Sequence, residues 1–131
     1  MVTKPIEPSY HSINQFFVVD DAPAFISFLV TVFDGIEARD RDVRADGTVD
    51  HADVAIGDSH VMISDPAAGQ DARPSVSYAY VRDVDAVFTA AMNAGAELPV
   101  EPADRAWGDR VGGFTDPFKN RWWIATPKQW R

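Results

Sequence analysis

The stretch WGDRVGGFTDPFKNRWWIATP, Trp107 to Pro127, combines turn residues with a strongly aromatic segment. Asp116 to Asn120 is typical of a tight connection, and Gly112-Gly113 is typical of a place where two backbones approach closely. The stretch therefore predicts a β-hairpin that ends in an aromatic strand. Trp122 and Trp123 are adjacent on that strand, so their side chains must point to opposite faces. One indole can enter a core while the other lines whatever covers the second face.

The composition indicates an ordinary globular protein. The chain has 131 residues, of which 46% are apolar, and it carries a formal charge of −8 and no cysteine. This acidity argues against a nucleic-acid groove or an anionic membrane surface as a partner, because both require clustered lysine and arginine. The cysteine count excludes disulfides and thiolate metal sites. No run of 18 apolar residues occurs, so we expect a soluble, untargeted, cytoplasmic protein.

The first half of the chain has an apolar segment, an amphipathic helix and then a set of short strands. Asp20-Asp21 supplies carboxylates that can cap the helix, and Asp34-Gly35 stops it, with Gly35 as the expected left-handed cap. Apolar residues recur between them at helical spacing. The expected strands are residues 13–19, a charged edge strand at 36–43, and residues 51–56 and 60–64.

The second half repeats this order after a turn-rich segment, Asp65 to Pro74, which is the one credible linker. Asp83 is expected to cap a helix that ends at Ala94-Gly95. The two halves superpose with an offset of 62, which places Val19 on Val81. Such a repeat indicates two equivalent modules that share a core. The expected strands of the second module are residues 76–81, 97–100, 110–115 and 121–125.

Four segments carry a resemblance to a known family: the βαβββ repeat itself, Asp46 to Asp65, Val81 to Leu98, and Trp107 to Pro127. Together they resemble the vicinal oxygen chelate superfamily, and within it the PhnB-like branch of glyoxalase/bleomycin resistance/dioxygenase proteins. The resemblance implies an α+β fold in which paired βαβββ modules form a cupped mixed sheet around a cleft, with the helices outside. It implies one domain over residues 1–131, with modules at about 12–65 and 75–127, and a homodimer. The modules can pair within one chain or across the dimer.

The resemblance also implies where a metal would bind. Metalloenzymes of the superfamily use His, Glu or Gln at the start of the first strand of each module and carboxylates near the end strands. The matching positions here are Asn14, Val76, Ile63 and Trp123. Apart from the weak oxygen donor of Asn14, none of these side chains can bind a metal. We therefore predict a metal-free protein with no cofactor.

Strand parity places a set of aromatic side chains in the expected cleft. Such a lining suits a planar or apolar organic molecule held by stacking, with tyrosine hydroxyls and an asparagine amide setting its orientation. The alternative is that the rings fill the cleft and leave no pocket. The predicted ligand-binding residues are Asn14, Phe16, Tyr78, Tyr80, Trp107, Phe114 and Trp123.

A second hypothesis is an enzyme, such as a lyase, an isomerase or a dioxygenase-like protein. His51 and Asp53 lie two residues apart on one strand face and could act as an acid–base pair or bind a divalent metal at a displaced site. The same pair could equally be a solvated strand face or a structural hydrogen bond, and His60 is expected at the surface or at a strand end. Asp109 or Arg110 could hold a polar group of a ligand or form a salt bridge. A third hypothesis is a dimeric scaffold without a ligand.

Overall fold

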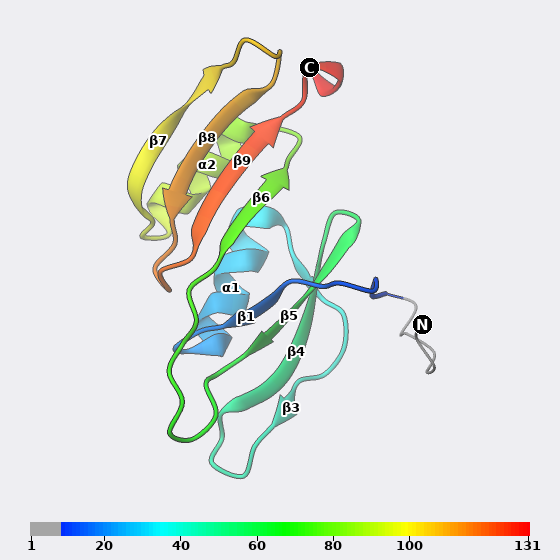
Figure 1. Cartoon of the computed structure of the whole chain (residues 1–131), viewed down its shortest axis with the longest axis vertical. Coiled ribbons are helices and arrows are strands. Elements are labelled where there is room, and N and C mark those ends of the chain that lie inside the picture. Colours follow the sequence, from blue (N-terminus) through cyan, green and yellow to red (C-terminus); the bar gives the residue numbers. More distant parts are fainter. Residues whose placement is uncertain (1–8) are drawn as a thin grey trace. The chain divides into compact units, whose positions relative to one another are not determined.

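The computed structural model describes residues 9–131 and shows an α+β chain with the predicted repeat (Figure 1). The chain divides into two compact units. One takes in the chain up to Val30 with Asp34–Arg73, and the other Thr31–Phe33 with Pro74–Arg131. The first module contains β1 (Phe16–Val18), α1 (Ala22–Phe33), β2 (Ile36–Glu37), β3 (Asp42–Val43), β4 (Val49–Ile56) and β5 (Ser59–Ser64). The second contains β6 (Val76–Tyr80), α2 (Val84–Asn93), β7 (Glu97–Asp104), β8 (Arg110–Thr115), β9 (Arg121–Thr126) and the 3₁₀ turn η1 (Lys128–Trp130).

The sheet of the first unit has the strand order β1-β5-β4-β2, and β3 pairs with β4. β1 runs parallel to β5, while β4 and β5 form an antiparallel hairpin around Gly57-Asp58. The single edge strand expected at residues 36–43 is instead two short strands, so that prediction is wrong. The segment between them, residues 38–41, is rich in charges, and Nε of Arg41 lies 2.8 Å from the Glu37 carboxylate.

An aspartate caps each end of helix α1. The Asp21 carboxylate accepts a hydrogen bond from the Ala24 N–H, 3.2 Å away. At the other end Asp34, not Gly35, adopts the left-handed conformation with φ of 55°, so the predicted glycine cap is wrong by one residue. Gly35 is required for space, because a Cβ there would lie 2.8 Å from Cγ1 of Val54. Phe25 and Leu29 are fully buried, and the ring of Phe25 lies 4.9 Å from that of Phe17 on β1.

The sheet of the second unit has the order β6-β9-β8-β7, with β6 parallel to β9, and α2 packs against β7, β8 and β9 (Figure 1). Asp83 caps α2 through the Ala86 N–H at 3.1 Å, as predicted. β7 is longer than the expected strand at 97–100. Its register to β8 shifts twice, and Pro99 and Pro102 within it cannot donate ladder hydrogen bonds.

The turn between β8 and β9 is built on one buried carboxylate. Asp116 accepts hydrogen bonds from the N–H groups of Phe118 and Asn120, at 2.8 and 3.0 Å. Its second oxygen accepts from the indole N–H of Trp122 at 2.8 Å. Lys119 itself takes a left-handed conformation with φ of 75°. The carboxylate therefore stabilises a turn in which a lysine occupies a position that favours glycine.

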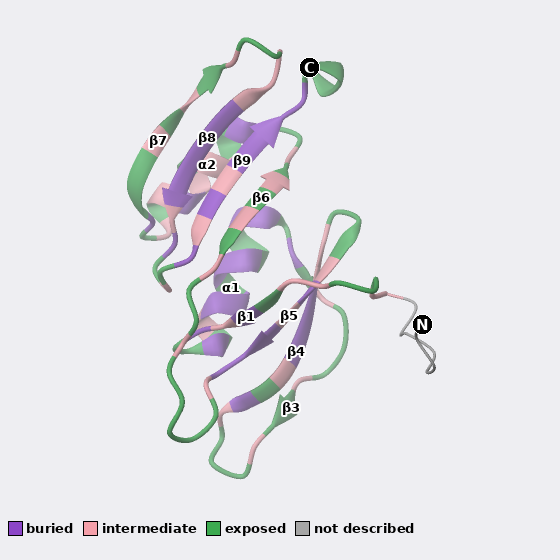
Figure 2. Ribbon diagram, viewed as in Figure 1, coloured by how far each residue is buried: buried purple, intermediate pink, exposed green. Residues whose placement is uncertain are grey.

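Each sheet has a helix on one face, and we call the other face its open face (Figure 2). In the first unit Phe17 and Ile63 are fully buried on the helix side, whereas Phe16 is 46% exposed on the open face. In the second unit Trp122 is buried, and Trp123 lies on the open face. The predicted opposition of the two tryptophans is confirmed. Within residues 9–131, neither helix is long and apolar enough to cross a membrane.

Candidate functional site

The open face of the first unit carries a row of three residues on neighbouring strands, Phe16, Met62 and Asp53. Asp53 is fully buried, although it lies on this face, because other polar side chains cover it. One carboxylate oxygen lies 2.8 Å from Nδ1 of His60, and the other accepts a hydrogen bond from Nη2 of Arg39 at 3.0 Å. A single carboxylate thus holds an imidazole and a guanidinium.

Tyr10 completes this cluster. Its ring meets the His60 ring edge-on at 6.2 Å, and the Arg39 guanidinium lies over it at 5.6 Å. Burial raises the pKa of the Asp53 carboxyl. Hydrogen bonds from His60 and Tyr10, together with the charges of His60 and Arg39, lower that pKa by a larger amount. The net pKa of Asp53 lies below its usual range. Asp53 is therefore ionised at neutral pH.

His51 does not belong to this cluster in the way that the sequence indicated. Its ring packs edge-on against Phe16 at 6.5 Å, and the hydrogen-bonding histidine of Asp53 is His60. The prediction of a hydrogen-bonded His51–Asp53 pair is wrong, whereas His60 lies near the start of β5, as expected for a residue at a strand end. The signal that was missed is the two-residue turn, Gly57-Asp58, which sets Ala55 opposite His60 and so places Asp53 diagonally across from it.

The open face of the second unit is aromatic. Tyr78, Trp123 and Gly113 form a row on neighbouring strands. The absence of a side chain at Gly113 admits the indole of Trp123, because a Cβ there would lie 2.7 Å from the ring. The rings of Tyr78 and Tyr80 are 5.4 Å apart, and these residues are 48% and 58% exposed. The face therefore presents three adjacent rings.

Arginine and tyrosine add polarity to this face. The guanidinium of Arg121 lies 4.8 Å over the ring of Trp123 and donates to the carbonyl oxygen of Leu98 at 2.8 Å. Burial, followed by the neighbouring Tyr80 and Asp109, raises the pKa of the Tyr78 hydroxyl, which the charge of Arg105 lowers only in part. Tyr78 is thus a hydrogen-bond donor at neutral pH.

The other predicted site residues lie elsewhere. Phe114 is fully buried beside Trp122 on the helix side, so its predicted place at the rim of a cleft is wrong. Trp107 is 67% exposed in the turn between β7 and β8, where its indole donates to Asp109 at 3.2 Å. The amide of Asn14 is engaged with the backbone of His11, at 2.8 and 2.9 Å.

Comparison with known proteins places these features in a family. The family model described as the Glyoxalase/Bleomycin resistance protein/Dioxygenase superfamily matches residues 11–124. The chain belongs to this superfamily. Protein Mb0911c of Mycobacterium bovis is 35% identical over 133 residues, which covers 93% of this chain and 85% of that protein.

Solved structures of other proteins share the fold. TioX from Micromonospora sp. ML1 has a TM-score of 0.70 at 26% identity, over 88% of this chain and 95% of that one. Protein PA1353 from Pseudomonas aeruginosa has a TM-score of 0.69 at 20% identity, over 90% and 98% of the two chains. At this level of identity, the similarity to PA1353 shows a shared fold only.

The residues at the metal positions of the superfamily do not fit a divalent metal. Val76 and Trp123 offer no donor, and the Asn14 amide is occupied by backbone groups. Ile63 is fully buried on the helix side, and Met62 takes the open-face position in its place. Across residues 9–131, no group of three or more His, Cys, Asp or Glu side chains could hold a metal ion.

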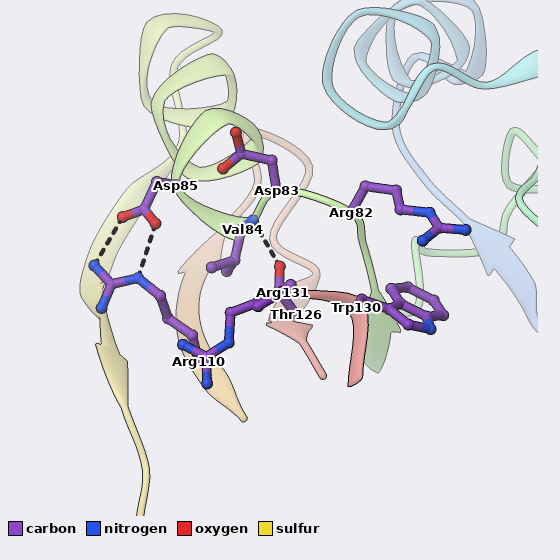
Figure 3. A pocket seen from close by; sticks show the side chains of 8 residues that line it. All are labelled: Arg82, Asp83, Val84, Asp85, Arg110, Thr126, Trp130 and Arg131. Carbon is purple, nitrogen blue, oxygen red and sulfur yellow. Dashed lines mark hydrogen bonds and ion pairs between the residues drawn. The ribbon is translucent and has the colours of Figure 1, made fainter. Parts of the chain in front are cut away.

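A polar pocket of about 220 Å³ lies at the start of α2 in the second unit (Figure 3). Its cations are largely paired: Arg110 binds Asp85 and Asp104 at 2.8 and 3.3 Å. Arg110 is therefore committed to salt bridges, which was one of the two alternatives for it. The residues that line the pocket are Arg82, Asp83, Val84, Asp85, Arg110, Thr126, Trp130 and Arg131.

Proposed function

We propose that the chain is a PhnB-like, metal-free member of the superfamily that binds a planar aromatic molecule on the open face of its second unit. The observation that carries this proposal is the row of Tyr78, Trp123 and Gly113, in which two rings lie side by side on a flat strand surface. Exposed aromatic rings in a cluster are unusual on a protein surface and mark binding sites.

The physical basis is stacking with a polar restraint. A planar ligand laid on Tyr78 and Tyr80 removes apolar area from water at about 25 cal/mol per Å². The Tyr78 hydroxyl supplies a donor, and Arg121, fixed over Trp123, supplies a positive charge. Together they favour a planar ligand that carries an acceptor or an acidic group at one end.

The test is fluorescence titration with 8-anilinonaphthalene-1-sulfonate, which is aromatic and anionic. Trp123→Ala is expected to weaken its binding by about tenfold, since base-type stacking on one aromatic side chain contributes about 1–3 kcal/mol. Val30→Ala is a control, because Val30 is an exposed apolar residue on α1 of the first unit. Equal affinity of the wild type and Trp123→Ala would refute the proposed face.

We further propose a homodimer, and native mass spectrometry of untagged protein purified without chelator tests this together with the metal-free state. A dimer at its peptide mass, or with an organic adduct, supports both proposals. A dimer with about one divalent metal per chain would overturn the metal-free proposal. A monomer would overturn the homodimer and leave the titration result unaffected.

A further inference from the structure

We propose that His60 and Asp53 form a general-base dyad, on the open face of the first unit, that removes a proton from a small, mostly apolar carbon acid. This activity does not rest on the proposed ligand face, which lies in the second unit. His60 is the catalytic residue, and Asp53 is a positioning residue. The argument has three steps: the proton on His60, the cation beside it, and the apolar neighbours.

The carboxylate fixes which nitrogen of His60 is free. An ionised carboxylate can only accept hydrogen bonds, so Nδ1 of His60, 2.8 Å away, must carry the proton. Nε2 then keeps its lone pair and is the nitrogen that can accept a proton. The side chain is 24% exposed, which leaves the base accessible from the open face. This is the orientation that a general base needs.

The guanidinium of Arg39 lies on the other oxygen of the same carboxylate, at 3.0 Å. Its side chain is 41% exposed, and this bond uses only Nη2. When a base takes a proton from carbon, negative charge develops on the substrate. A cation held by the carboxylate that orients the base is placed to stabilise that charge, with no reorganisation at the moment of transfer.

The neighbouring side chains determine the substrate class. Phe16 and Met62 share the row with Asp53, and Phe16 is 46% exposed. An apolar substrate can rest on these side chains beside the base. In the reaction the C–H bond breaks, an N–H bond forms at Nε2, and the electron pair remains on the substrate and passes into its electron-withdrawing group. The imidazolium can later return the proton, so no co-reactant is required.

The experiment uses 5-nitrobenzisoxazole as the probe. Loss of its C–H proton breaks the ring N–O bond and gives a coloured cyanophenolate, so the rate reports proton removal from carbon. We expect His60→Gln to slow this reaction at least about tenfold, since a positioned base contributes roughly 10²–10⁴-fold. The matched control is His11→Gln, which removes an exposed imidazole outside the cluster and should retain the wild-type rate within about twofold.

Two further readouts separate catalysis from a structural role. Asp53→Asn should shift the midpoint of the pH–rate profile to lower pH, because a neutral amide no longer stabilises the imidazolium. Nitrogen NMR of the wild type should show His60 protonated at Nδ1. A wild-type rate equal to that of folded His60→Gln, or a proton on Nε2, would overturn the proposal.

Discussion

The two units have the same strand arrangement but carry different side chains at equivalent positions of their open faces. In the first unit the row across the sheet is Phe16, Met62 and Asp53, and in the second it is Tyr78, Trp123 and Gly113. In the first unit a carboxylate with polar partners therefore occupies the row position that Gly113, without a side chain, occupies in the second unit. The backbone register is common to both rows, so the repeat fixes where side chains lie and leaves their chemistry free to differ.

The helices show the same contrast. In both units a side chain at the end of the last strand accepts a hydrogen bond from the first N–H of the helix. In the first unit it is the Asp65 carboxylate, 2.8 Å from the Ala22 nitrogen, and in the second it is the Thr126 hydroxyl, 2.9 Å from the Val84 nitrogen. A charged acceptor thus serves one module and a neutral acceptor the other.

The largest expected effect comes from removing these acceptors. Asp65 also accepts from the Val49 N–H at 2.7 Å, so Asp65→Ala leaves two buried donors unpaired. We expect a loss of about 3–4 kcal/mol in the free energy of unfolding, against about 1–2 kcal/mol for Thr126→Ala. Urea denaturation of both variants measures the difference. A loss for Thr126→Ala as large as that for Asp65→Ala would break the contrast between the caps.

The next effect concerns the carboxylate that only the first unit has. Asp53→Asn is expected to lower the free energy of unfolding by about 2 kcal/mol at pH 7, because charge-assisted hydrogen bonds are lost. The lowered folded-state pKa of Asp53 means that its contribution is present above the ordinary pKa of about 3.9. It is lost as the pH falls through the folded-state value.

Thermal unfolding of wild type and Asp53→Asn between neutral and acidic pH checks this dependence. The two stability curves should begin to converge as the pH falls below about 4, and they should meet below the folded-state pKa of Asp53, where the wild-type carboxyl is also neutral. Glu37→Gln, on a half-buried surface pair with Arg41, is the control and should change stability by less than about 1 kcal/mol. A constant gap at all pH values would exclude Asp53 as the source.

A smaller effect is expected where the second unit lacks a side chain. Gly113→Ala places a methyl group 2.7 Å from the Trp123 ring, which must then move. We expect a loss of about 1–3 kcal/mol, as for other overpacked sites, together with weaker binding of the naphthalenesulfonate probe. Gly47→Ala is the matched control for a glycine with open space around it, although its φ of 89° adds strain of its own. Unchanged probe affinity in Gly113→Ala would separate the glycine from the ligand face.

The smallest effect lies in the hairpin turns. The first unit has Gly57 at φ of 56°, while the second has Lys119 at φ of 75°. Lys119→Gly should raise the free energy of unfolding by about 0.5–1 kcal/mol by removing left-handed strain, and Gly57→Ala should lower it by about 1 kcal/mol. Chemical denaturation resolves both changes. A destabilised Lys119→Gly would show that the Asp116 cradle already removes the strain.

The sequence predicted the fold and the alternation of faces well, because hydrophobic periodicity and capping residues act locally. Strand parity alone assigned Trp122 and Trp123 to opposite faces. The position of Asp83 just before the helix predicted that it caps α2. The Asp53 cluster was missed because its members come from four separated segments. Tyr10, Arg39 and His60 meet Asp53 only through strand register and loop paths, which one chain without pairing information does not determine.

Parity also failed where the register was uncertain. Ile63 was placed at a metal position, yet it is the neighbouring Met62 that faces away from the helix. A slip of one residue on a strand exchanges the two faces. Phe114 was assigned to a rim for its place in an aromatic stretch, although Gly113 beside it takes the open face.

The parallel pairing of β1 with β5, and of β6 with β9, has a consequence for synthesis on the ribosome. In each unit the first strand pairs with the last, through hydrogen bonds such as Val19 N–H to the Ser64 carbonyl and Val81 N–H to the Ala125 carbonyl. During synthesis β1 therefore has no partner strand until β5, which ends at Ser64, has left the exit tunnel. Nascent chains of increasing length should become protease-resistant in two steps, one for each completed sheet.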